Sequence, residues 1–396
     1  MVLTASLGGN RLLARPGERR LHLLDPPAAA LWDLYASGLD TADLAGLLGE
    51  RFGLATDLVQ TQVAGLIDEW RLAGLLGQAG ETPPAWRLGH PDEPVWPALH
   101  PRPWPHHARR LRVADRTVAL EPAASFLLTR RLGTCLPAAR ARGPVDHRLR
   151  LHGTPAAWRL TLDGTLQDEG RSPEAALVAV FTTLTELGCR PAERLLVVHG
   201  AGLVEPDGRG LLLVAPGGSG KSTLAAALDA TGFGLLSDDV VPVTLEGELL
   251  GLGLPLCLKA GSWPVLAAPR PELAQAPTVQ RYGQPVRYLP ARTPAAGRRV
   301  RPARLVLSRW RPEAPLQAVP LTPEQALHGL LAAEAVIRDL TQTKLSSLAH
   351  WIEGLPAWRL TYPDLDAARA WLCRPPLGTV QQPVAQCPRQ SRVTLR

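Results

Sequence analysis

Lysine is almost absent from this chain of 396 residues. Only three of its 43 basic residues are lysines, Lys221, Lys259 and Lys344, and the other 40 are arginines. A compact ammonium on a flexible stem and a planar guanidinium do not replace each other well at a site that needs one of them. Each lysine therefore marks a position where arginine has not taken over.

Long apolar runs are missing as well. No window approaches the roughly 20 uninterrupted apolar residues that a membrane span needs. The first 20 residues contain no sustained hydrophobic core of the kind found in a signal peptide. We therefore expect no membrane association and a cytoplasmic location.

Cysteine is scarce and scattered. The five cysteines are odd in number and never form a CxxC pair, which excludes a disulfide scaffold and argues against a metal site. With 45% hydrophobic and 20% charged residues, the composition indicates a soluble globular protein and excludes collagen-like sequence and disorder throughout. The length allows two or more domains.

Charge is distributed unevenly. Residues 1–80 carry 6 arginines and 9 acidic residues, a net charge of −3. Because the whole chain has a net charge of +7, the remaining residues carry +10. A negative N-terminal part argues against nucleic-acid binding by charge. The arginine-rich segment 101–150 either holds an acidic peptide or phosphates, or is a solvated surface.

Residues 1–78 form the first compositional unit. The apolar run 21–24 favours a strand, and Asp25 followed by Pro26 is typical of a helix start. The spacing of apolar residues predicts three short helices, which together with the strand indicate a small winged-helix-like domain. These helices are expected from Pro26 to about Ala36, from Thr41 to before Gly53, and from Thr56 to Gly74.

Proline marks the boundary of this unit. The segment 79–108 holds eight prolines, a density that prevents continuous helix and favours a semi-rigid linker. Residues 109–372 are expected to form an α/β domain, because buried-type strands at 194–199, 210–215 and 232–239 alternate with helical patterns. The Pro- and Gln-rich segment 373–396 is expected to be a disordered tail.

The strongest motif is APGGSGKST, residues 215–223. It fits the phosphate-binding loop G-x-x-x-x-G-K-[ST], with Ala215 in place of the first glycine. A chance glycine-rich turn is the alternative, but the motif requires a strand before it and a helix after it, and both are predicted. Lys221 is expected between the β- and γ-phosphates, and Ser222 is expected to bind Mg²⁺. The predicted nucleotide-binding residues are Gly217, Gly218, Ser219, Gly220, Lys221, Ser222 and Thr223.

Two further patterns stand near this loop. Asp238 and Asp239 end the next hydrophobic strand, where one carboxylate can serve Mg²⁺ and the other can accept a proton from an attacking hydroxyl. A solvated turn is the alternative. His199 ends the strand before the loop strand, although a lone histidine is more often a packed or surface residue.

Residues 199–243 resemble the catalytic core of HPr kinase/phosphorylase and its relatives, in which a strand ending in His-Gly precedes the phosphate loop and an Asp-Asp pair follows it. The resemblance extends over roughly 180–372. It implies an ATP- and Mg²⁺-dependent P-loop kinase in which Asp238 is the general base, Asp239 works with His199 and the metal, and Lys221 binds the nucleotide. The next segment lacks the family's EIRGLGI signature, which argues against HPr as substrate and against phosphorolysis.

Residues 23–76 resemble a PqqD-type domain, the leader-peptide recognition element of enzymes that modify ribosomally made peptides. The Asp-Pro helix start, Leu31-Trp32 and the third apolar helix carry the likeness. It implies that a leader peptide adds a strand to an exposed sheet edge and contacts the third helix. The peptide-binding residues implied are Leu21, Leu23, Leu66 and Trp70, although Leu66 and Trp70 can also be core residues.

Together these patterns predict a serine/threonine kinase that phosphorylates a ribosomally synthesised precursor peptide, such as a lasso peptide, captured through its leader. Other peptide-tailoring enzymes are further candidate partners, and the kinase relatives are often homo-oligomeric. Two alternatives stay open: an HPr-type protein kinase, and a nucleotide-switched module that presents the leader without phosphoryl transfer. Lys344 is expected on a surface helix, without an assigned role, and Lys259 either contacts phosphate or substrate or is a surface lysine. The acceptor residue, the number of phosphates and the choice between ATP and GTP are not predicted.

Overall fold

The computed structural model divides the chain into two units. Unit 1 comprises Met1–Pro103 with Cys387–Arg392, and unit 2 comprises Trp104–Gln386 with Val393–Arg396. The expected linker 79–108 lies outside the described residues. No helix in the described part of the chain is long and apolar enough to cross a membrane. The structure describes residues 2–18, 20–52, 56–76, 109–121, 132, 135, 136, 141–154, 157–373 and 391–394.

Unit 1 begins with an antiparallel sheet, of which the sequence analysis expected only one strand. The turn at Gly8 and Gly9, where φ is 57° and 87°, joins the first two strands. The sheet then leads into three helices, and Asp25 caps the first of them by accepting a hydrogen bond from the Ala28 N–H at 2.9 Å. The elements are β1 (Leu3–Leu7), β2 (Asn10–Ala14), β3 (Arg20–Leu24), α1 (Pro26–Ala36), α2 (Thr41–Phe52) and α3 (Thr56–Leu72).

The core of unit 1 lies between these helices and the sheet. Trp32 of α1 meets Trp70 of α3 edge to face, with ring centroids 5.1 Å apart. Leu44, Val63 and Ile67 belong to the same cluster. The predicted helices are confirmed, whereas the assignment to the winged-helix class stays a prediction.

The edge of this sheet is paired with another segment of the same chain. The strand order is β1-β2-β3-β22, in which β22 is Ser391–Thr394. The sequence analysis expected an exposed edge at β3 and a disordered tail from 373 onward. The structure differs on both points, because residues 391–394 are extended and hydrogen-bonded to β3, while residues 374–390 lie outside the described part.

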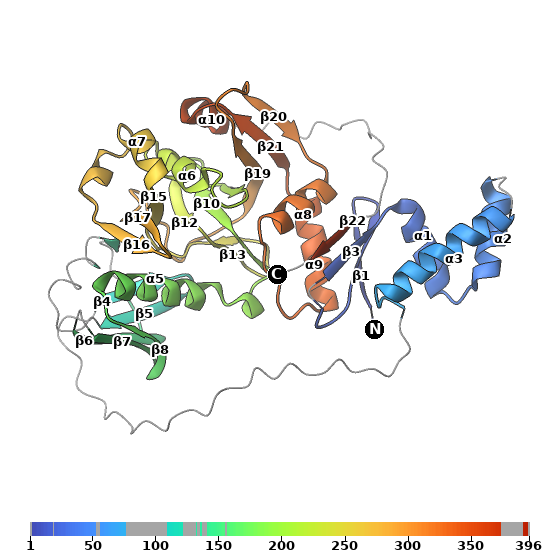
Figure 1. The fold of residues 1–396 in the computed structure, drawn as a ribbon, viewed down its shortest axis with the longest axis horizontal. Helices are drawn as coiled ribbons and strands as arrows, with labels where there is room; N and C mark the ends of the chain where they lie inside the picture. Colours follow the sequence, from blue (N-terminus) through green and yellow to red (C-terminus); the bar gives the residue numbers. More distant parts are fainter. Residues whose placement is uncertain are drawn as a thin grey trace. The chain divides into compact units, whose positions relative to one another are not determined.

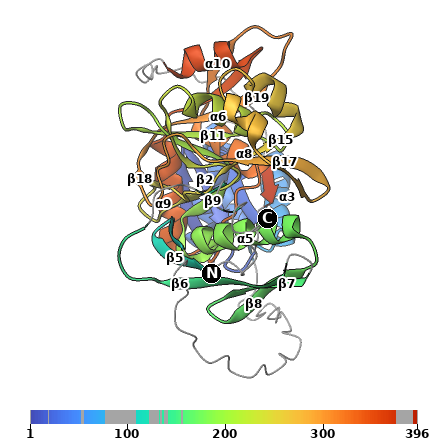
Figure 2. The same ribbon diagram turned by 90° about the vertical axis from the view of Figure 1, so that its left-hand side faces the viewer.

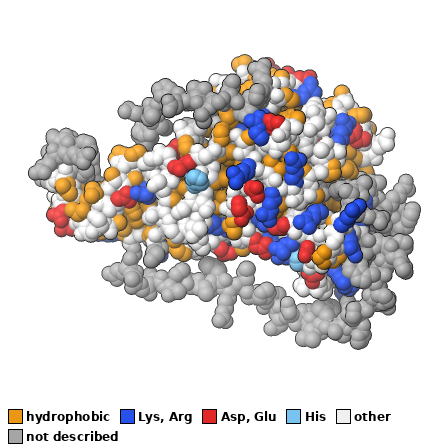
Figure 3. Space-filling model, turned by 180° about the vertical axis from the view of Figure 1, so that it is seen from behind, with side chains coloured by type: hydrophobic (Ala, Val, Ile, Leu, Met, Phe, Trp, Pro, Cys, Tyr) orange, Lys and Arg blue, Asp and Glu red, His pale blue; other side chains and the backbone are white. Residues whose placement is uncertain are grey.

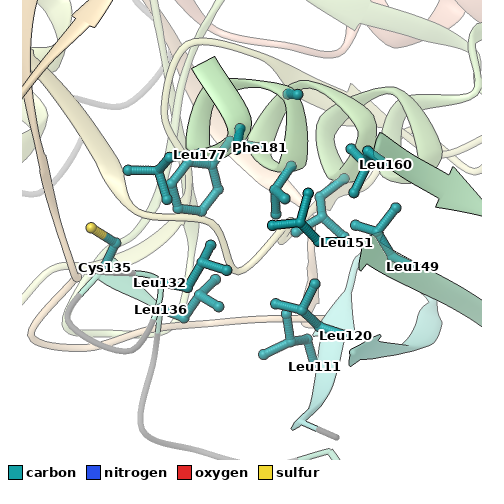
Figure 4. Close-up of a cluster of buried hydrophobic side chains, with 14 of the residues drawn as sticks. Leu111, Leu120, Leu132, Cys135, Leu136, Leu149, Leu151, Leu160, Leu177 and Phe181 are labelled. Carbon is teal, nitrogen blue, oxygen red and sulfur yellow. The ribbon is translucent and has the colours of Figure 1, made fainter. Parts of the chain in front are cut away.

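Unit 2 starts with a five-stranded sheet that the sequence analysis did not anticipate. Helix α5 (Pro173–Cys189) covers it, as Figures 1 and 2 show. Leu177 and Phe181 point from α5 towards the leucines of the sheet (Figure 4). The strands are β4 (Arg109–Val113), β5 (Arg116–Glu121), β6 (His147–Thr154), β7 (Ala157–Leu162) and β8 (Thr165–Gly170), paired in that order.

Two arginines of this region pair with acidic groups. Arg150 lies 2.6 Å from Glu121 and Arg116 lies 2.8 Å from Glu193. On the face seen in Figure 3, basic and acidic side chains are interspersed. These pairs favour the interpretation of the arginines as ordinary surface residues.

A six-stranded mixed sheet forms the centre of unit 2. Strands β11, β19 and β21 run parallel, and β10 is antiparallel to both β11 and β12. Helices α6 (Lys221–Asp229) and α10 (Leu365–Leu372) pack together on it. The order is β12 (Gly234–Ser237), β10 (Gly200–Val204), β11 (Gly210–Val214), β19 (Pro302–Trp310), β21 (Ala357–Tyr362) and β20 (Gln317–Pro320).

Two small sheets, the short helix α7 (Trp263–Leu266) and two longer helices complete the described part of the unit. One sheet has the order β18 (Arg299–Val300), β14 (Leu249–Leu250), β13 (Val241–Val243) and β9 (Leu196–Val198). The other has the order β15 (Leu256–Lys259), β17 (Gln284–Leu289) and β16 (Thr278–Arg281). The longer helices are α8 (Pro323–Ala332) and α9 (Gln342–Glu353). The result is a mixed α/β unit with several sheets.

One of the three lysines has a structural role in α9. Lys344 is buried rather than at the surface, where the sequence analysis placed it. Its ammonium donates to the carbonyl oxygen of Arg338 at 2.6 Å and approaches those of Pro191 and Ala192 at 3.5 and 3.4 Å. Lys344 therefore joins α9 to two loops by satisfying their carbonyl groups.

Candidate active site

The strand order brings three separate sequence patterns to one edge of the central sheet. Because β11 and β12 are both antiparallel to β10, they are parallel to each other and end at the same edge as β10 begins. Gly200 lies opposite Val214, and Gly202 lies opposite Ser237. The loop after β11, the carboxylates after β12 and the histidine before β10 therefore meet.

His199 stands between two strands that belong to different sheets. It follows β9 and precedes β10, so the strand directly before the loop strand is β10 and not the run 194–199. Gly200 permits this change of sheet, because a Cβ there would lie 2.5 Å from the carbonyl oxygen of Leu213. The tight contact holds the His199 backbone close to the end of β11.

The phosphate-loop motif adopts a conformation that its glycines make possible. Gly218 and Gly220 have φ angles of 79° and 89°, in the left-handed region that favours glycine. Gly220 directly precedes the first residue of α6, so the positive end of that helix faces the loop. The loop thus has the backbone form that receives an anion in proteins with this motif.

Lys221 lies inside the loop that precedes it. Its side chain is buried, and its ammonium donates to the carbonyl oxygens of Ala215 at 2.6 Å and Pro216 at 3.1 Å. Burial lowers the pKa of this ammonium, while the charges of Asp238 and Asp239 act in the opposite direction. The loop therefore carries a positive charge at its centre, held by its own backbone.

The segment Leu256–Ser262 forms one side of the site. The charge of Lys259 contributes to the lowered pKa of Lys221, so the second lysine lies within electrostatic reach of the loop. Thr223 and Ser262 share a hydrogen bond of 2.6 Å between their hydroxyls. The N–H of Cys257 donates to Oδ2 of Asp238 at 3.0 Å. Residues 258–262 therefore pack directly against the phosphate loop.

Asp238 is the buried member of the carboxylate pair. Burial and the neighbouring charge of Asp239 raise its pKa from 3.8 to about 6. The Ser222 hydroxyl lies near enough to reduce this rise in part. A carboxylate whose pKa lies near neutrality is suited to accept a proton.

Asp239 has the opposite environment, although it is the adjacent residue. Its carboxylate lies 3.3 Å from Nε2 of His199 and 2.9 Å from Nη2 of Arg281. The hydrogen bond with His199 and the charge of Arg281 outweigh burial and hold the pKa of Asp239 well below its usual range. Its positive φ of 72° turns the backbone so that the two neighbouring side chains take different partners.

The residues present fit a nucleotide with Mg²⁺. Oδ1 of Asp238 and Oγ of Ser219 are buried without a hydrogen-bond partner among the described residues, which is costly unless a ligand satisfies them. No group of three His, Cys, Asp or Glu side chains is placed to hold a metal in the described chain. Mg²⁺ does not require one, because it binds one or two carboxylates together with phosphate oxygens.

Part of this arrangement is not evident from the sequence. Arg281, at the end of β16, contacts both Asp239 and the Cys257 sulfur, the latter at 3.3 Å. Glu334 lies 3.8 Å from Nδ1 of His199. Neither residue belongs to a motif, so only the fold reveals them. The division of roles between Asp238 and Asp239 stays a prediction, as do the assigned nucleotide contacts.

The four residues expected to bind a peptide differ in burial within unit 1. Leu21 and Trp70 are buried, at 2 and 3% exposure, so their side chains serve the packing of the unit as it stands. Leu23 and Leu66 are half-buried and keep some accessible surface. Leu23 and Leu66 can therefore contact a peptide directly, whereas Leu21 and Trp70 can do so only after a rearrangement of unit 1.

Comparison with known proteins gives little beyond this geometry. No family model matches the chain, and no curated protein matches it. A solved structure, that of the HPr(Ser) kinase/phosphatase from Coxiella burnetii, is 14% identical and covers 44% of this chain and 94% of that chain, with a TM-score of 0.21. A match at this TM-score carries no argument, so the interpretation depends on the site itself.

Proposed function

We propose that this protein is an ATP-dependent kinase that phosphorylates a serine or threonine hydroxyl of a precursor peptide held by unit 1 through its leader. The observation that carries the proposal is the pair Asp238 and Asp239, whose pKa values are pushed apart beside a phosphate loop. Two adjacent carboxylates with opposite pKa shifts are typical of sites that divide acid-base work from charge stabilisation.

The residues of the site have distinct tasks in this reaction. The backbone N–H groups of the loop and the start of α6 bind the phosphates, and Lys221 leaves its loop carbonyls to neutralise charge on the transferred group. Mg²⁺, when bound through Ser222 and a carboxylate, supplies further charge neutralisation. Asp239 stays ionised, and His199 and Arg281 hold its orientation.

Asp238 receives the proton from the acceptor hydroxyl. As the hydroxyl oxygen bonds to the γ-phosphorus, the bond between that phosphorus and the β–γ bridging oxygen breaks and ADP leaves. The proton of the hydroxyl passes to the carboxylate of Asp238, which returns it to solvent. A pKa of about 6 leaves this group ionised at pH 7 and still able to accept a proton.

Binding of the leader by unit 1 explains why the phosphoryl-transfer site can be permissive. A tethered peptide reaches an effective concentration in the millimolar range for short flexible connections. Strand β3, with its half-buried Leu23, and helix α3, with its half-buried Leu66, offer the kind of surface to which a peptide strand adds once β22 is displaced.

The variant Asp238→Asn separates a kinase from a nucleotide-switched module. The protein is incubated with Mg²⁺ and γ-labelled ATP together with the precursor peptide encoded beside its gene, and ATP binding is measured in parallel by calorimetry. A kinase loses transfer of the label to the peptide while its affinity for ATP stays within a few-fold of the wild type. Transfer that persists in the variant excludes Asp238 as the base, and binding without transfer in the wild type favours the switch.

A further inference from the structure

The strand β22 occupies the edge at which a leader peptide would add. Strand β3 has β2 on one side and β22 on the other. A free sheet edge presents a row of unpaired N–H and C=O groups and readily accepts another strand. The β3 edge is therefore filled by a segment of the same chain, Ser391–Thr394.

This segment comes from far along the sequence. Helix α10 ends at Leu372 and β22 begins at Ser391; Ser391 and Arg392 group with unit 1, whereas Val393 and Thr394 group with unit 2. Because β22 and β3 belong to one polypeptide chain, their connection makes the pairing intramolecular. The local concentration of β22 is therefore fixed by the connection and does not depend on protein concentration.

The strand is also short, which limits how firmly it can bind. It has four residues, fewer than the five of β3 beside it. Each backbone hydrogen bond contributes about 1 kcal/mol net in water, and ordering each residue costs a similar amount. A docked strand of this length is thus held weakly, and a longer peptide with side-chain contacts to α3 can replace it.

We propose that β22 is a built-in competitor of the leader peptide, docked on β3 until a leader takes its place. The proposal rests on the proposed function in one respect, namely that unit 1 binds the leader by strand addition at β3. When only a minor fraction of the protein molecules is in the binding-competent form, the apparent affinity for the ligand is reduced by that fraction. If the docked form outnumbers the open form by about ten to one, removing β22 tightens leader binding roughly tenfold.

The test compares two truncations of the full chain. One deletes residues 391–396 and removes β22, and the matched control deletes only residues 395 and 396. Binding of a fluorescein-labelled leader peptide, taken from the precursor encoded beside the gene, is measured by anisotropy for both and for the wild type. A synthetic peptide of residues 387–396 is then added in trans to the chain that lacks β22.

The expected result is a roughly tenfold lower Kd for the chain without β22, with the control unchanged and the 387–396 peptide displacing the leader. Equal leader affinity in all three proteins overturns the proposal. It is likewise overturned if the 387–396 peptide fails to bind the truncated chain.

One further outcome tests the proposed leader recognition separately from the competition by β22. If the 387–396 peptide binds the truncated chain and the leader binds none of the three proteins, leader recognition at β3 is refuted. Competition between β22 and the leader is then refuted as well. A concentration-dependent dimer that disappears with the deletion of 391–396 shows exchange of β22 between copies, and this outcome contradicts competition within one chain.

Discussion

Replacing Asp238 by asparagine should stabilise the protein while it removes activity. The amide keeps the shape of the carboxylate, and its oxygen can still accept the hydrogen bond from the Cys257 N–H. What disappears is a negative charge that is buried, adjacent to Asp239, and without a partner at Oδ1 among the described residues. The variant therefore removes an unfavourable interaction together with the proposed base.

The size of the effect follows from the pKa of Asp238. Its value rises from 3.8 to about 6, a difference of about 2, and each pKa unit corresponds to about 1.4 kcal/mol. Because the folded protein holds the proton more tightly than the unfolded chain, wild-type stability falls as the pH rises from about 4 to about 6. The variant escapes this loss, so its advantage grows over that range to at most about 3 kcal/mol and is then constant.

Urea unfolding of the wild type and Asp238→Asn at pH 4, 5, 6 and 7 measures this difference. Asp229→Asn is the matched control, because Asp229 is also buried but accepts hydrogen bonds from Arg270 at 2.7 Å and from the Arg292 N–H at 2.9 Å. Breaking that pair should cost about 3–5 kcal/mol. The reasoning is refuted if Asp238→Asn destabilises the protein as Asp229→Asn does, or if its effect does not change with pH.

Further substitutions test other contacts. Arg304→Met leaves the buried carboxylate of Glu205, now 2.6 Å from Arg304, with only the more distant Arg209 at 3.7 Å, and urea unfolding should show a loss of about 3–5 kcal/mol. Lys344→Met removes the donor to the Arg338 carbonyl and should cost about 1–3 kcal/mol in the same assay, with no change in ATP affinity. Arg281→Gln removes the cation that lowers the pKa of Asp239, so stability should fall at pH 7, and this loss should shrink below about pH 4. An equal loss at both pH values contradicts that account.

Local sequence signals predicted the elements of the site well. The phosphate loop was recognisable because its glycines and Lys221 are required by backbone geometry and charge, which act over a few residues. The helix start at Pro26 was also predictable, because capping depends on neighbouring residues. The strand and helix on either side of the loop are confirmed as β11 and α6.

The contacts of the site required the fold. Arg281 reaches Asp239 across 42 positions of sequence, and Lys344 reaches Ala192 across 152. No periodicity or spacing rule connects residues so far apart. Lys344 appeared to be a surface residue for the same reason, since the loops whose carbonyls it satisfies are distant in the chain.

Strand pairing was the other part that the sequence could not show. The strands β4 to β8 pair in chain order, which no single strand's sequence reveals, and the mostly exposed β8 has no apolar alternation that marks it as a strand. The short segment Ser391–Thr394 lies in a region of low hydrophobicity, and only its pairing with β3 makes it a strand.

The central claim is phosphoryl transfer to a peptide, and intact-mass spectrometry of that peptide tests it most directly. The precursor peptide encoded beside the gene is incubated with the protein, ATP and Mg²⁺, and in parallel with Asp238→Asn. The account predicts a mass increase equal to one or more phosphate groups on a serine or threonine with the wild type, and none with the variant. An unchanged peptide mass with the wild type, under conditions in which calorimetry shows both ATP and the leader bound, would contradict it.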